Sequence, residues 1–374
     1  MKTKKTLIAL AALGAFAGAA SAQSSVTMFG VVDVNVMTVD NNDRTYSMGT
    51  DGMVGSRLGF RGVEDLGGGL KASFWLEMGL APDTGRNASV WGNGTTPTNN
   101  NTLFFNRRST VSLSNPWGEL RLGRDYTPTF WNWNINDPFG NNGVGAATNL
   151  ALGQGARNEF QSGATYGTLV RANNMVQYIL PNGLYGPGLY GHIAAAAGEN
   201  ANGNKFWGGR IGYAAGPFDI AVAYGETQHL LAGTDVDASV WNIGGSWKFG
   251  FMMLSGFYGQ IDLDNLNQLP VAVPFPSNKA KRENWFVAVV APVGQWNLKA
   301  SYGGTNGKDT FENVDASQWA LGVDYNVSKR TALYATWASI NNDGLAQFTV
   351  STQSSALSPG NNSTGGQIGV RHNF

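Results

Sequence analysis

The chain has 374 residues, with 25 Lys and Arg against 25 Asp and Glu, so its formal net charge is zero. This balance excludes a polybasic nucleic-acid-binding protein, and a charged fraction of 13% is low for a soluble domain. Cysteine is absent, so no disulfide stabilises the fold.

The N-terminal segment has the pattern of a secretory signal peptide. A basic stretch, Met1 to Lys5, precedes an apolar run from Leu7 to Ala20 and a small-residue cleavage site, Ala20-Ser21-Ala22. The apolar run is too short for a transmembrane anchor, which needs about 20 residues. We predict that residues 1–22 are removed and that residues 23–374 form one domain with 22 basic and 25 acidic residues.

Beyond Val26 the sequence alternates apolar and polar residues in segments of about ten, the spacing of β-strands with two different faces. In the first, Met28, Val32 and Val34 share one face and Asp33 shares the other with Asn35. The expected strands span 26–36, 54–62, 70–78, 106–113, 119–123, 173–180, 189–197, 206–215, 218–224, 240–249, 252–261, 284–291, 296–302, 317–325, 332–340 and 366–374.

Short turns alternate with longer polar connections along this series. The longer connections include 40–51, 82–102, 262–282, 303–315 and 341–365. No apolar run after Gln23 could cross a membrane as a helix, which leaves a closed barrel as the way to span one. We predict an all-β fold, a 16-stranded antiparallel transmembrane β-barrel with girdles of aromatic residues near the strand ends, Trp75 and Trp207 among them. A large soluble β-sandwich would alternate too, but would not place its long loops at every second connection.

The longest connection runs from Gly123 to Arg171 and includes Phe130-Trp-Asn-Trp-Asn-Ile-Asn-Asp-Pro-Phe-Gly140. Connections of this length are usually functional or disordered. We predict that it folds into the mouth of the barrel and narrows it.

The chain resembles the trimeric general porins of Gram-negative outer membranes, especially the β-proteobacterial type. The resemblance rests on Ser25 to Asp33, Ser56 to Gly67, Gly123-Arg-Asp-Tyr-Thr-Pro128 with Asp137-Pro-Phe-Gly140, Arg171-Ala-Asn-Asn174, and the terminal Ile368 to Phe374. It implies an outer-membrane homotrimer in bilayer and lipopolysaccharide, with one water-filled pore per chain. It also implies that Phe374 is the signal read by the barrel-assembly machinery.

Arginines are the candidates for a basic wall at the constriction. Arg57 and Arg61 are opposite in phase to Leu58 and Phe60, so they turn inward, because arginine facing lipid costs about 2–4 kcal/mol at the midplane. The side chain of Arg171 is also expected to point inward.

Two positions stay open. Phase favours Arg108 as the inward residue of its strand, whereas the resemblance favours Arg107. Arg124 shares the phase of Leu120 and Leu122, although the family position puts it in the pore. A bulge at Gly123, or a place for Arg124 at the base of the loop, would resolve that conflict.

The facing acids are expected to be Asp137, with Asp125 and Glu159 behind it, all in or next to the long loop. Because arginines outnumber them, we predict a mild preference for small anions. Trp131 and Trp133 form either an aromatic track for sugar rings or an apolar anchor that pins the loop to the wall.

Catalytic and metal-binding arrangements are not visible, since His192, His229 and His372 lie far apart in the sequence with no ligand spacing. We therefore predict no enzyme and no cofactor. The leading hypothesis is passive diffusion of small hydrophilic solutes and ions. The alternatives are a substrate-selective porin for a sugar or organic anion, and a surface adhesin or barrel enzyme.

Overall fold

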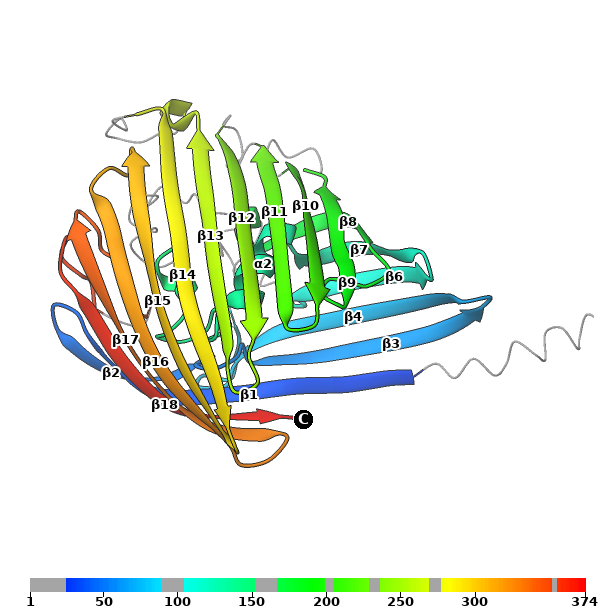
Figure 1. Ribbon diagram of the computed structural model, residues 1–374, viewed down its shortest axis with the longest axis horizontal. Coiled ribbons are helices and arrows are strands. Elements are labelled where there is room, and N and C mark those ends of the chain that lie inside the picture. The colour runs from blue at the N-terminus through cyan, green and yellow to red at the C-terminus, as the bar shows by residue number, and fades with distance from the viewer. Residues whose placement is uncertain are drawn as a thin grey trace, which may run out of the picture.

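The computed structural model describes residues 25–88, 104–151, 167–198, 205–228, 236–268, 277–351 and 355–374. The predicted signal peptide, residues 1–22, lies outside this range. Within it, no helix has the length and apolar character needed to cross a membrane. Nearly all of the regular structure is strand, and every strand belongs to one antiparallel sheet system (Figure 1).

The strands are β1 (Ser25–Asp40), β2 (Arg44–Thr50), β3 (Arg57–Gly67), β4 (Leu70–Ala81), β5 (Arg86–Asn87), β6 (Arg108–Asn115), β7 (Gly118–Tyr126), β8 (Arg171–Ile179), β9 (Gly188–Ala196), β10 (Lys205–Ala215), β11 (Phe218–Gln228), β12 (Asp237–Lys248), β13 (Met253–Asp264), β14 (Lys279–Val293), β15 (Trp296–Asp309), β16 (Val314–Asn326), β17 (Thr331–Gly344) and β18 (Ser363–Asn373). The helices are α2 (Pro128–Asn136), η2 (Ala147–Asn149), α4 (Gly167–Val170) and η3 (Leu266–Gln268).

These segments form a closed wall of sixteen strands in the described part of the chain. β2 and β3 count as one strand, because they lie in line along the same edge of β1, and β5 only extends the pairing of β4 by two residues. Each remaining strand pairs with its neighbours in the chain, and β1 pairs with β18 from Val31↔Asn373 to Asp40↔Thr364. This last pairing closes the barrel, so the predicted fold class is confirmed.

Each expected strand corresponds to one wall strand, but wall strands extend into the expected loops, as two examples show. The expected connection 40–51 contains β2, which pairs with β1 through Thr38↔Tyr46 and Val36↔Met48. Similarly, β15 continues to Asp309, so the connection expected at 303–315 is shorter. The sequence expectation failed there because polar and glycine residues in these stretches still form ladder hydrogen bonds with a neighbouring strand.

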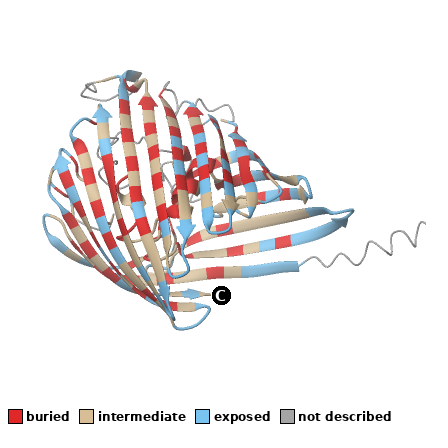
Figure 2. Ribbon diagram, viewed as in Figure 1, coloured by how far each residue is buried: buried red, intermediate tan, exposed pale blue. Residues whose placement is uncertain are grey.

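Side chains alternate between the two faces of the wall, as Figure 2 shows by the banding of buried and exposed residues along the strands. On β6, Val111 and Leu113 are exposed on the outside, whereas Thr110 and Ser112 are buried inside. The outer face carries touching aromatic pairs such as Trp207–Tyr224, Trp241–Tyr258 and Tyr302–Trp319, a row typical of an interfacial girdle. The girdle position expected for Trp75 is wrong, because its indole lies on the inner face beside Glu77.

Candidate functional site: an arginine cluster facing an inward loop

The connection between β7 and β8 folds into the barrel, and polar side chains of the inner wall hold its backbone. The amide of Asn132 donates to the carbonyl of Ala221 on β11 (2.9 Å) and to Oδ1 of Asn242 on β12 (3.0 Å). Ser255 of β13 donates to the carbonyl of Asn136 (2.7 Å). Further along the loop, Gln318 of β16 donates to the carbonyls of Gly145 and Ala146.

Apolar packing fixes the same loop against the same side of the barrel. Trp133 stacks on Phe257 of β13, with ring centroids 4.9 Å apart, and Phe257 stacks on Phe286 of β14. Phe139, Val144 and Leu150 are buried in one cluster with inner-wall residues of β12, β13, β14, β16 and β17. The loop is therefore a packed lining of one wall, which leaves the opposite wall, β3 to β8, facing the lumen.

Removing the Trp133 anchor should release the loop. A buried Trp→Ala change costs about 3–5 kcal/mol in a packed core, and here the loss falls on the contact between α2 and the wall. We expect amide hydrogens of residues 128–136 to exchange at least tenfold faster in Trp133→Ala, measured by hydrogen exchange with mass spectrometry. Trp117→Ala, at an exposed short turn, is the control and should leave α2 unchanged. Equal protection of α2 in both variants would mean that this stack does not hold the loop.

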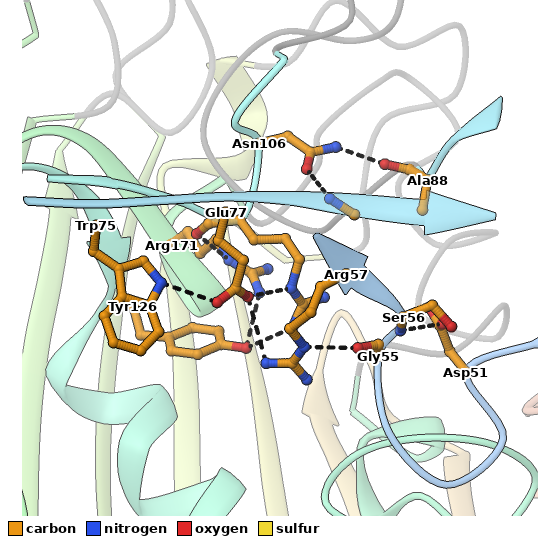
Figure 3. Close-up of polar contacts among 12 residues, drawn as sticks. Asp51, Gly55, Ser56, Arg57, Trp75, Glu77, Ala88, Asn106, Tyr126 and Arg171 are labelled. Carbon is orange, nitrogen blue, oxygen red and sulfur yellow. Dashed lines mark hydrogen bonds and ion pairs between the residues drawn. The ribbon is translucent and has the colours of Figure 1, made fainter. Parts of the chain in front are cut away.

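On the opposite wall, three arginines lie around one carboxylate and one phenol; Figure 3 labels Arg57 and Arg171 among them, with Glu77 and Tyr126. Glu77 Oε1 on β4 accepts from Nε of Arg107 at 2.7 Å and from Nη1 of Arg57 at 3.4 Å. The hydroxyl of Tyr126 accepts from Arg171 (2.8 Å) and from Arg107 (3.3 Å). We call Arg57, Arg107 and Arg171 with Glu77 and Tyr126 the arginine cluster.

A strand interruption positions Arg57 in this cluster. The chain leaves the wall after β2 and returns at β3, and the Nε–H of Arg57 donates to the carbonyl of Gly55 in the intervening segment (2.8 Å). The backbone N–H of Ser56 is in turn bonded to the Asp51 carboxylate (2.6 Å). The position of the Arg57 guanidinium is therefore set both by its strand and by its bond to the segment between β2 and β3.

A second group of charges lies beside the cluster and is nearly neutral. Asp125 accepts from Nη1 of Arg121 at 2.7 Å and lies 3.5 Å from Nε of Arg108, while Arg121 also bonds Glu119 at 2.8 Å. Both Arg107 and Arg108 thus reach the interior, one through Glu77 and the other through Asp125. The open choice between them has no single answer, because Arg107 precedes β6 and its side chain is not bound by the strand's alternation.

Arg124 is held at the base of the loop. The pairing of β7 with β8 shifts register between Gly123 and Asp125, with Gly123 at φ 123° and the extra residue on β8. Arg124 donates to the carbonyl of Asn106 and to Oδ1 of Asn173, both at 2.6 Å. The register therefore shifts next to Gly123, where a bulge was expected, although the extra residue is on β8. The guanidinium of Arg124 is bonded to these two asparagines.

The structure places the expected acids differently from the sequence prediction. Asp125 belongs to β7 and is paired with arginines of the wall. Asp137 is buried, and its carboxylate accepts from the backbone N–H groups of Phe139, Asn141 and Ala147 in its own loop. Burial raises the pKa of the Asp137 carboxyl, although these three bonds favour its charged form. Glu159 lies outside the described residues.

The remaining predicted residues are not members of the cluster. Arg61 is on the inner face, toward the short-turn end of β3, with Trp75 opposite it on β4. Trp131 is half-buried between Tyr126 and Tyr185, at centroid distances of 5.4 and 6.0 Å. Trp133 is an anchor of the loop, so of the two tryptophans Trp131 is the one that still reaches the lumen.

Sequence reasoning missed Glu77, Tyr126, Arg121 and Arg210. Glu77 alternates with Leu76 and Met78, and Arg121 with Leu120 and Leu122, so the phase argument used for Arg57 would have found both. Arg210 of β10 bonds to Asn132 of α2, a contact between distant segments that no local pattern signals.

A closed wall with apolar residues outside, charged residues inside and a loop folded into its interior defines a channel-forming protein of the outer membrane. A family model described as Gram-negative porin matches residues 9–345. The chain belongs to this family. It is 36% identical over 385 residues to outer membrane porin protein 32 of Delftia acidovorans, covering 99% of this chain and 100% of that protein.

Two further relatives are also porins. An outer membrane porin protein of Bordetella pertussis is 29% identical over 423 residues, covering 99% of this chain and 100% of the relative. The solved structure of an anion-selective porin from Comamonas acidovorans superposes with a TM-score of 0.76 at 33% identity, covering 94% of this chain and 100% of that one. The protein is thus an outer-membrane channel.

Proposed function

We propose that the channel passes small hydrophilic solutes by passive diffusion, without catalysis, and prefers small anions. The arginine cluster carries this proposal, since it gathers three guanidinium groups: Arg57 and Arg107 bond Glu77, and Arg171 bonds the hydroxyl of Tyr126. In the described part of the loop, residues 127–151, the one charged residue is Asp137, which is bonded within its own loop, so this part offers little negative charge across the lumen. The related Comamonas acidovorans channel is described as anion-selective, which supports the same assignment.

The size of the preference follows from Coulomb's law. One uncompensated positive charge about 7 Å from a passing ion changes its energy by about 0.6–2.4 kcal/mol at an effective dielectric constant of about 20–80. Salt screens this interaction, so we expect an energy near the lower end of this range and therefore a modest selectivity. Planar-bilayer recording tests the proposal: a reversal potential with the anion sign in a KCl gradient is expected, and cation preference would overturn it.

A substrate-selective channel is the second candidate, because Trp131, Tyr126 and Tyr185 form a chain of neighbouring rings by the loop. Such a track would bind sugar rings by stacking. Saturable block of the ion current by one sugar, with the other sugars inert, would favour it over general diffusion.

We further propose that the chain is exported through its signal peptide and assembles as a homotrimer in a lipopolysaccharide bilayer. An apolar groove of about 930 Å³ on the outer face, lined by residues such as Met48, Leu321, Trp337 and Ile368, supports a contact between protomers. Phe374 pairs with Gly30 where the barrel closes, a position consistent with a role in assembly. Channel insertion in conductance steps of three would support the trimer, and single steps would contradict it.

A further inference from the structure

Arg61 rests on two aromatic rings inside the barrel. Its guanidinium carbon lies 5.4 Å from the ring centre of Phe29 on β1 and 5.3 Å from that of Trp75 on β4. The two rings meet edge to face, with centroids 4.9 Å apart. Gly59 allows the Phe29 ring to lie against the strand, since a Cβ at this position would come within 2.7 Å of it.

This group lies in the lumen on the short-turn side of the arginine cluster. Arg61 pairs across the sheet with Thr27 and Trp75, and it follows Arg57 by four residues, about 13 Å along an extended strand. The indole N–H of Trp75 donates to Glu77 of the cluster (3.1 Å), and Arg108 lies over the same indole, 4.6 Å from the ring. Arg61 therefore lies on the same wall as the cluster, displaced along β3 toward the short turns.

Arg61 differs from its neighbours in having no carboxylate partner among the described residues. Arg57, Arg107, Arg108 and Arg121 each pair with an acid. Arg61 is exposed, and its interactions in the described structure are with the two rings. Its N–H donors thus remain available to a solute while the two rings contact the guanidinium.

We propose that Phe29, Arg61 and Trp75 form a binding site for planar aromatic carboxylates, which rests on the proposed function and deepens it by naming a solute class. A guanidinium can donate two parallel hydrogen bonds to a carboxylate, and its flat face stacks on aromatic rings. An aryl carboxylate satisfies both features at once. Because the rings already contact Arg61 and limit its motion, less side-chain entropy should be lost when the solute binds.

Benzoate is the probe, and chloride current through single channels is the readout. Benzoate should reduce the current in a saturable manner, whereas acetate, which lacks the ring, should not. Cyclohexanecarboxylate has the same charge and similar size but no flat ring. It should need at least a fivefold higher concentration for the same block.

Two variants separate the charge from the rings. In Arg61→Gln the half-blocking concentration of benzoate should rise at least tenfold. In Phe29→Leu, where the charge is intact, it should rise at least threefold while acetate stays inert. Arg330→Gln removes an exposed charge from a short turn and should behave as wild type.

Equal block by benzoate in wild type and Arg61→Gln would overturn this site, as would equal block by benzoate and cyclohexanecarboxylate in the wild type. Neither result would affect the anion preference assigned to the cluster. A cation-preferring channel that benzoate still blocks through Arg61 would overturn only that preference.

Discussion

Replacing Arg57, Arg107 and Arg171 together by glutamine is expected to remove the anion preference. The change takes three positive charges from the lumen wall and leaves Glu77 as the charge of the cluster. Because one charge is worth about 0.6–2.4 kcal/mol at this range, the anion-to-cation permeability ratio should fall to about one or below. The reversal potential of reconstituted channels in a KCl gradient measures it.

A matched control removes three basic residues elsewhere. Arg44, Lys329 and Arg330 are exposed on the described surface, and their joint replacement by glutamine should leave the reversal potential unchanged. If both triple variants shifted it equally, the preference would arise from the total charge of the protein and not from the cluster.

Glu77→Gln is expected to have the opposite effect on selectivity and a large effect on stability. The carboxylate neutralises part of the cluster, so its loss should increase the anion preference. It also leaves Arg57 and Arg107 without their acid, and breaking a buried ion pair costs about 3–5 kcal/mol. The reversal potential should move further in the anion direction, and the barrel should unfold at a lower temperature by circular dichroism.

Asp137→Asn distinguishes the two carboxylates. Its side chain is bonded to the backbone of its own loop, so we expect a smaller change in reversal potential than for Glu77→Gln. Glu64→Gln, at an exposed position of β3, should change neither selectivity nor unfolding temperature. A larger shift for Asp137→Asn than for Glu77→Gln would return the role of the facing acid to the loop.

The wall was predictable from the sequence because strand periodicity is strict. Leu58 and Phe60 outside imply Arg57 inside, and the register of β1 with β3 and of β3 with β4 agrees. The same rule applied to β4 and β7 finds Glu77 and Arg121. The conflict at Arg124 was also informative, because the expected irregularity lies between Gly123 and Asp125.

The partners of the arginines could not be predicted. The alternation along a strand shows which face of the wall a side chain is on, but not which residue of another strand lies next to it. Arg107 meets Glu77 from a position 30 residues away, and this contact depends on the register between β4 and β6. Asp137 was expected to face the arginines across the lumen, because polar loop residues usually face water. Its bond to the N–H of Phe139 is a local Asx turn, but the bonds to the N–H groups of Asn141 and Ala147 depend on how the loop folds back.

A disulfide between the loop and the wall tests the central claim most directly. The chain has no cysteine, and a Cβ at Gly244 of β12 would lie 3.2 Å from Cγ of Asn136 in α2. Asn136→Cys with Gly244→Cys should therefore form a cross-link on oxidation, and the oxidised channel should conduct like the reduced one, because the loop already lies against this wall. No cross-link, or loss of current on oxidation, would contradict a lumen that stays conducting with the loop folded inside.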